Sequence, residues 1–192
     1  MKTLKLKGTV RETVGKKSTK ALRKSDAVPC VLYGGGKNLH FEVTNSELRK
    51  LIYTPEIFLV ALNIDGKTVN AIMQDAQFHP VKDNVLHVDF YEVSAKKPIV
   101  MAVPVQLEGL AEGVKAGGKL SLEMRRLKVK GLYGDIPEVL KIDISDLGLG
   151  KTIQVASLSF DKLELVSPKE AVVCAVKLTR AARGAAATAP KE

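Results

Sequence analysis

Cysteine and histidine are scarce in this sequence, with two and three residues among 192. Cys30 and Cys174 both lie inside apolar, strand-like runs, and neither belongs to the Cys-x-x-Cys or Cys/His spacings that bind metals. We therefore expect two buried thiols, no metal and no other cofactor.

Long apolar runs are also missing. No stretch approaches the roughly 18 apolar residues that a membrane span needs. The first ten residues, MKTLKLKGTV, alternate charged and apolar side chains where a secretory signal would have a continuous apolar region. These absences predict a cytoplasmic protein without a membrane partner.

Acidic residues are almost absent from the first 24 positions. These positions hold nine Lys or Arg against Glu12 alone, a local charge of +8, whereas the other 168 residues hold 21 basic and 20 acidic side chains. A concentrated basic segment attracts phosphate groups and releases their counterions on binding. Nucleic acid is favoured over an anionic membrane, because the lysines are not interleaved with the Trp, Phe and Leu of an interfacial helix.

The segment 15–36, GKKSTKALRKSDAVPCVLYGGG, combines cations with an aromatic residue and three consecutive glycines. RNA fits this combination, because it offers both phosphates and flat bases for stacking. Ordinary structure fits it as well: a solvated helix face, a half-buried strand residue at Tyr33 and a glycine turn. Composition alone leaves both interpretations open. The cations are Lys16, Lys17, Lys20, Arg23 and Lys24.

Hydrophobic periodicity predicts a mainly β (α+β) chain whose N-terminal half forms a small β-barrel. The pair Asp65-Gly66 predicts a type I′ hairpin, because both residues readily take positive φ angles. Only two short helices are expected, at 20–24 with Ser18 or Thr19 as the N-cap and at 46–53. Strands are expected at 2–10, 28–33, 39–43, 57–64, 67–73 and 85–93.

The polar segment 94–98, SAKKP, lacks core residues and separates two strand-rich halves. It predicts a boundary between a domain at 1–95 and a second, all-β domain at 96–182. Residues 183–192 are low in complexity and are expected to form a flexible tail. Strands of the second domain are expected at 99–107, 119–130, 139–144, 152–155, 163–166 and 171–178.

Two motifs suggest catalysis but lack essential parts. Residues 113–119, GVKAGGK, have phosphate-loop spacing, yet Leu120 stands where Ser or Thr would ligate magnesium and a strand is expected where a helix should begin. His87 and Asp89 lie two residues apart on one strand face with no nucleophile beside them. We therefore expect a glycine-rich turn at 113–119, and no enzyme. His79, which precedes Pro80, is expected in a turn.

The segment QDAQFHPVKDNVLHVDFYEV at 74–93 carries the strongest family resemblance. With Gly15-Lys16, TKALRKSDAVPCVLYGGG at 19–36 and the Asp65-Gly66 hairpin, it resembles the bacterial large-subunit ribosomal protein family number twenty-five. The resemblance is specific for 1–95; over 96–182 it rests on length and strand pattern, which look like the long form, general stress protein Ctc.

This resemblance implies a structural protein of the large ribosomal subunit whose N-terminal β-barrel binds 5S ribosomal RNA. The alternative is a stress-related module that binds a protein partner through its C-terminal β domain. Further partners implied by the resemblance are the large subunit itself and neighbouring ribosomal proteins contacted by the C-terminal domain. The expected location is cytoplasmic and ribosome-associated.

The resemblance also assigns roles to residues. His87 and Asp89 are implied to contact base and ribose edges, and the strand alternation independently places both on an exposed face. Asp89 is the candidate for specificity, because a carboxylate accepts from base N–H groups but is repelled by phosphate. Phosphate and groove contacts are implied for Arg11, Lys16, Lys20 and Arg23, and a backbone or stacking contact for Tyr33.

One position departs from the family pattern. The family often has two adjacent basic residues in the helix, whereas here Ala21 follows Lys20. One phosphate contact is therefore either absent or supplied by Lys17 or Lys24. Secondary RNA contacts are expected from Lys17, Lys24, Gln74, Arg125 and Arg126.

Overall fold

The structure, a computed structural model, describes residues 1–179. Packing divides the chain into two compact units: the first unit is Met1–Ile99 with Leu132–Glu138, and the second unit is Val100–Gly131 with the residues from Val139 onward. The boundary expected between 95 and 96 stays a prediction, and the tail expected at 183–192 lies outside the described residues. Among the helices described, none is long and apolar enough to cross a membrane.

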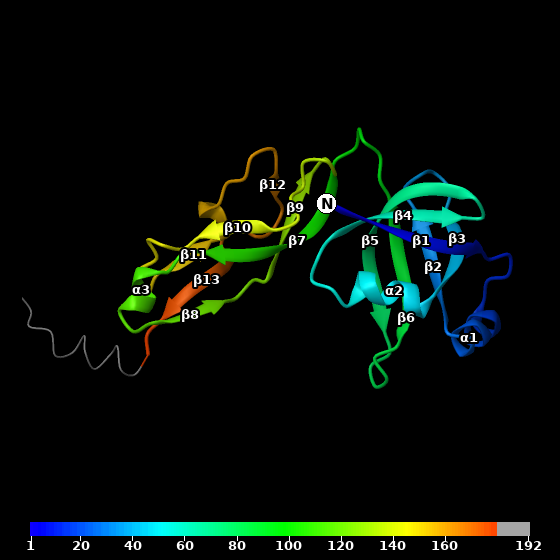
Figure 1. The fold of residues 1–192 in the computed structure, drawn as a ribbon, viewed down its shortest axis with the longest axis horizontal. Helices are drawn as coiled ribbons and strands as arrows, with labels where there is room; N and C mark the ends of the chain where they lie inside the picture. The colour runs from blue at the N-terminus through cyan, green and yellow to red at the C-terminus, as the bar shows by residue number, and fades with distance from the viewer. Residues whose placement is uncertain (180–192) are drawn as a thin grey trace, which may run out of the picture. The chain divides into compact units, whose positions relative to one another are not determined.

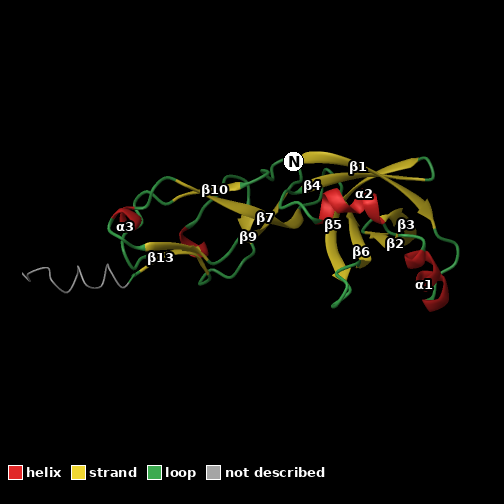
Figure 2. Ribbon diagram, turned by 60° about the horizontal axis from the view of Figure 1, so that its bottom comes forward, coloured by secondary structure: helices red, strands yellow, loops and turns green. Residues whose placement is uncertain are grey.

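The first unit is a closed six-stranded barrel, which confirms the predicted fold class (Figure 1). Its strands neighbour one another in the order β1-β3-β2-β6-β5-β4, and β4 closes the ring by pairing with β1 in parallel. Figure 2 shows its two helices, in red, outside the strands. The elements are β1 (Lys2–Val10), α1 (Lys16–Lys24), β2 (Ala27–Tyr33), β3 (Leu39–Thr44), α2 (Asn45–Ile52), β4 (Phe58–Ile64), β5 (Lys67–Phe78) and β6 (Val85–Glu92).

The alternation of buried and exposed side chains along β6 positions the candidate site. Val88 and Phe90 are fully buried, and Phe90 packs against Phe41 with ring centroids 5.7 Å apart. His87 and Asp89 point to the other side of the strand and stay partly exposed. Burial of the apolar residues therefore fixes which way the polar ones face.

The Asp65-Gly66 hairpin is confirmed. Asp65 has φ 46° and Gly66 φ 86°, the pair of positive angles that a type I′ turn requires. The second strand of this hairpin, β5, extends to Phe78, beyond the predicted end at residue 73. The register between β5 and β6 shifts between Met73 and Asp75, which leaves Gln74 as the extra residue of a β-bulge. The bulge interrupts the alternation of side chains between the two faces of the sheet, and for this reason the predicted strand ends too early.

The basic helix α1 begins at Lys16, so the predicted start at residue 20 was wrong. Gly15 is the N-cap, with φ 139°, an angle at which glycine is favoured. The Ser18 and Thr19 hydroxyls do not cap the helix; they donate to the carbonyls of Thr13 and Gly15 at 3.2 and 2.6 Å. Ser and Thr are common N-cap residues, and for this reason the sequence predicted one of them as the cap in place of Gly15.

The second unit is built from two small sheets, which confirms a second β domain. The sheets have the strand orders β10-β7-β9-β12 and β11-β13-β8. The elements are β7 (Ile99–Glu108), α3 (Glu112–Lys115), β8 (Lys119–Leu122), β9 (Arg126–Gly131), β10 (Leu140–Asp143), β11 (Thr152–Gln154), the 3₁₀ turn η1 (Val155–Ser157), β12 (Glu164–Leu165) and β13 (Val172–Lys177).

The single strand predicted at 119–130 was wrong, because β8 and β9 belong to different sheets. Between them, the backbone N–H groups of Glu123 and Met124 both donate to the carbonyl of Val173, so the extended ladder stops there. The apolar positions change phase across the break, from Leu120, Leu122 and Met124 to Leu127 and Val129, and the prediction of one continuous strand overlooked this signal. The one-turn helix α3 within the glycine-rich segment was also not predicted, but the strand expected after that segment is present as β8.

Candidate nucleic-acid interface

The basic helix α1 places five cations on one short element. Lys16, Lys17, Lys20, Arg23 and Lys24 are all exposed, and no residue of α1 is buried. A helix without a buried face gains little from packing, so it needs other contacts to keep its position.

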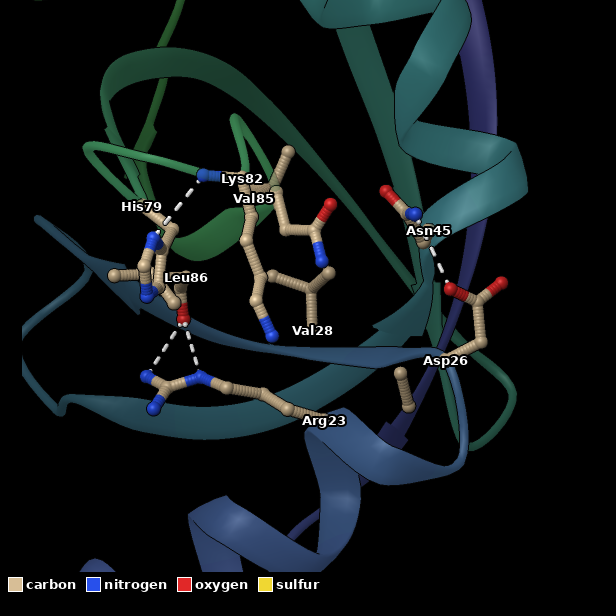
Figure 3. Close-up of a pocket in the computed structure, with 10 residues that line it drawn as sticks. Arg23, Asp26, Val28, Asn45, His79, Lys82, Val85 and Leu86 are labelled. Carbon is tan, nitrogen blue, oxygen red and sulfur yellow. Dashed lines mark hydrogen bonds between the residues drawn. The ribbon is translucent and has the colours of Figure 1, made fainter.

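Arg23 supplies such a contact. Its Nε and Nη2 atoms donate to the carbonyl oxygen of Leu86 at 3.1 and 2.8 Å (Figure 3). Leu86 directly precedes His87 on β6. The family resemblance implied a phosphate contact for Arg23, and in the structure its guanidinium holds α1 to the strand that carries His87 and Asp89.

The side chains of His87 and Asp89 contact each other on the outer face of β6. His87 Nδ1 lies 2.6 Å from Asp89 Oδ1, and the two side chains are 26% and 34% exposed. With its proton on Nδ1, a neutral His87 offers Nε2 as an acceptor, while Asp89 keeps a second oxygen for another donor. The pair can therefore accept hydrogen bonds from base and ribose edges in a fixed orientation.

The bulge at Gln74 brings two more polar residues beside this pair. Asp75 stands opposite Asp89 and Gln77 opposite His87 in the β5–β6 ladder. Cross-strand partners share a sheet face. Asp75, Gln77, His87 and Asp89 thus form one patch, the polar face. Neither Asp75 nor Gln77 was predicted as a site residue, although polar residues at 75 and 77 alternate with Ala76 and Phe78 in the sequence.

Tyr33 lies beside the polar face at the end of β2. It stands opposite Tyr91 on β6, and the two rings pack edge to face with centroids 5.7 Å apart. Burial raises the pKa of the Tyr33 phenol, and the negative charges of Asp89 and Asp75 raise it further. Tyr33 is therefore a partly buried strand residue that keeps its phenol neutral close to both carboxylates.

The remaining predicted residues lie outside α1, β2, β5 and β6. Arg11 follows β1; its backbone N–H donates to the carbonyl of His40 at 2.9 Å and its Nη2 to that of Thr13 at 3.4 Å. Arg125 and Arg126 are exposed in the second unit, immediately before and at the start of β9. The first unit thus collects most of the predicted residues, and the two arginines at 125–126 are not among them.

The site has the features of a binding surface. Within residues 1–179, no group of three or more His, Cys, Asp or Glu side chains could hold a metal ion. Cations on α1 lie next to a strand face of hydrogen-bonding side chains and an aromatic pair. This arrangement suits attraction of a polyanion together with hydrogen bonding to base edges.

Comparisons with known proteins cover both units. The Ribosomal L25p family model matches residues 6–90, and the model for the C-terminal domain of ribosomal protein TL5 matches residues 98–180. The chain is 64% identical over 197 aligned residues to large ribosomal subunit protein bL25 of Bacteroides thetaiotaomicron, with all of both chains covered. The protein of the same name from Porphyromonas gingivalis is 61% identical, with 97% of this chain and 98% of the relative covered.

Proposed function

Because the chain belongs to the bL25 family of large ribosomal subunit proteins, we propose that it is a structural component of that subunit and binds 5S ribosomal RNA through its first unit. The family is one of ribosomal proteins and not of enzymes. The protein then works in the cytoplasm, associated with the ribosome.

The observation that carries this proposal is the attachment of α1 to β6 through Arg23 and Leu86. The attachment holds a row of cations beside the polar face, so that phosphates and base edges of one RNA can be contacted together. Phosphate contacts provide most of the affinity, and base-edge contacts provide the preference for a sequence or shape.

Roles follow from the chemistry of each side chain. Lys16, Lys20 and Arg23 bind phosphates with Arg11, while His87 and Asp89 contact base and ribose edges. Tyr33, whose ring packs edge to face with Tyr91, contacts the RNA backbone or stacks on a base. Lys17, Lys24 and Gln74 add secondary contacts. Arg125 and Arg126 add contacts from the second unit, which also binds neighbouring ribosomal proteins.

A titration of 5S ribosomal RNA with the full chain at increasing salt tests the proposal. We expect the affinity to fall with a log–log slope of about −0.7 to −0.9 for each phosphate neutralised. An unrelated RNA of equal length is the control and should bind more weakly at every salt concentration. Binding that is indifferent to salt, or equal for the two RNAs, would contradict the proposal.

A further inference from the structure

A cavity of about 190 Å³ lies beside α1, outside the polar face. Figures 1 and 2 both place α1 and the turn between β5 and β6 at the same end of the barrel, and this cavity lies between them. Val28 and Val85 supply buried apolar lining. Arg23, His79 and Lys82 supply nitrogen donors from two separate segments of the chain.

Arg23 reaches the cavity already oriented. Two of its five N–H groups donate to the Leu86 carbonyl, which leaves three for a ligand. Because the Leu86 carbonyl fixes the plane of the guanidinium, little side-chain entropy remains to be lost when an anion binds.

His79 is held in one tautomer. Its Nδ1 accepts the backbone N–H groups of Val81 and Lys82, both at 3.2 Å, so the ring proton must be on Nε2. Figure 3 shows this second ring nitrogen on the side of Leu86 and Arg23. His79 therefore presents a donor to the cavity even when the imidazole is neutral.

The turn that carries Lys82 is closed by backbone hydrogen bonds. The N–H of His79 donates to the carbonyl of Asn84 at 2.8 Å, and the N–H of Asp83 donates back to the carbonyl of His79 at 2.9 Å. In Figure 3 the Lys82 side chain extends across the cavity with its amine toward Arg23. A firmly closed turn thus directs a flexible cation to the same place as the two fixed donors.

One acid lines the cavity, on the opposite side from His79 in Figure 3. Asp26 Oδ1 accepts the side-chain amide of Asn45 at 3.2 Å. A small tetrahedral oxyanion can therefore contact Arg23, His79 and Lys82 without approaching this carboxylate.

We propose that this cavity is a phosphate-binding subsite that takes a backbone phosphate of the bound RNA. The inference rests on the proposed RNA-binding function and extends its surface from the polar face to the end of the barrel. Arg23 joins the two parts, because it contacts Leu86 beside the polar face and also lines the cavity.

Variants of the full chain test the subsite against 5S ribosomal RNA. Lys82→Ala should weaken binding on the order of fivefold and reduce the log–log salt slope by about 0.7 to 0.9. His79→Asn keeps an acceptor near the Nδ1 position but removes the Nε2 donor, and should weaken binding about threefold while the salt slope stays the same. Lys67→Ala, an exposed lysine at the far end of β5, is the matched control and should change neither quantity.

A second titration separates RNA phosphate from free phosphate. Inorganic phosphate, compared with chloride at equal ionic strength, should shift the His79 ring resonances in the full chain, and Lys82→Ala should reduce these shifts. Phosphate binding without any effect of Lys82→Ala on RNA affinity would overturn the assignment to RNA. So would a variant that binds RNA like the wild type but is lost from large-subunit particles, because that result indicates a protein contact.

The subsite and the proposed function can fail separately. If wild-type protein shows no preference for 5S ribosomal RNA, the proposed function fails. If the wild type binds that RNA and Lys82→Ala behaves like Lys67→Ala, only the subsite fails.

Discussion

Asp89 illustrates how a single residue depends on its neighbours. Its Oδ1 is occupied by His87, and Asp75 stands opposite on β5, so the carboxylate lies in a negatively charged patch beside a basic helix. Such a patch repels phosphate groups and accepts hydrogen bonds from the N–H groups of bases. Under the proposed function, the polar face would favour particular RNAs, whereas α1 would attract any RNA.

Asp89→Ala should accordingly erode discrimination. We expect a loss of about 1 to 3 kcal/mol in the preference for 5S ribosomal RNA over an unrelated RNA, because one base-edge acceptor disappears. Lys16→Ala is the comparison variant, and it should weaken the binding of both RNAs by the same factor. Competition binding of the two RNAs measures the difference, and equal losses from both variants would refute this division of roles.

Cys30 gives a pH prediction at the same scale. Burial, supported by the negative charge of Asp89, raises the pKa of its thiol from 9.0 to about 12. Because the folded state holds this proton more tightly than the unfolded chain, the thiol's contribution to stability is complete below pH 9 and is lost as the pH rises toward 12.

Unfolding free energies of the wild type and Cys30→Ala between pH 8 and 11 test this sign. The wild type should lose about 1.4 kcal/mol per pH unit above pH 9 relative to the variant. Parallel curves for the two proteins would show that the thiol ionises equally in both states. Cys174 is common to both proteins and cancels from the comparison.

At the scale of elements, two of the three glycines after β2, Gly34 and Gly35, permit the close approach of neighbouring side chains. Gly34 has φ 105°, and a Cβ there would lie 2.8 Å from Cε2 of Tyr91, the ring that packs on Tyr33. Gly36 has a similar φ of 100° but open space around it. Both positions therefore require a positive φ angle, but only at Gly34 would an added side chain collide with Tyr91.

Gly34→Ala should be more destabilising than Gly36→Ala by about 1 to 3 kcal/mol, because only the first forces Tyr91 to move. Chemical denaturation measures both values. Binding of 5S ribosomal RNA should also weaken more for Gly34→Ala, since Tyr33 loses its partner. Equal effects would mean that the backbone angle alone explains the glycines.

At the scale of the whole molecule, each of the two units matches its own family model, and most of the predicted RNA-binding residues are in the first. Arg125 and Arg126 are in the second unit. Their charges add at most secondary contacts if the RNA site is complete on the barrel.

A double variant, Arg125→Ala with Arg126→Ala, should therefore keep its affinity for free 5S ribosomal RNA within about twofold. The double variant Lys16→Ala with Lys20→Ala should lose more than about tenfold in affinity for the same RNA at low salt, because two phosphate contacts disappear. Filter binding of the full-length variants measures both. A loss from the arginine pair as large as that from the lysine pair would place the main site outside the barrel.

Local sequence patterns determined much of this molecule. Alternation predicted β1 and β6, and Asp65-Gly66 predicted its hairpin. The capping residues Ser18 and Thr19 predicted a basic helix, although it begins earlier than expected. These features depend on neighbours within a few residues, so the sequence carries them directly. The bulge at Gln74 depends on which strand lies alongside, and periodicity could not locate it.

Only the tertiary structure decided how the candidate site is assembled. Arg23 and Leu86 are 63 residues apart, and they meet because β2 pairs in parallel with β6 beside α1. The antiparallel pairing of β5 with β6 sets Asp75 opposite Asp89, and the turn between these two strands brings His79 and Lys82 to the cavity that Arg23 lines. The sequence supplied the cations and the polar strand; the register of the barrel, which depends on burial of Phe41 and Phe90, determined which of them meet.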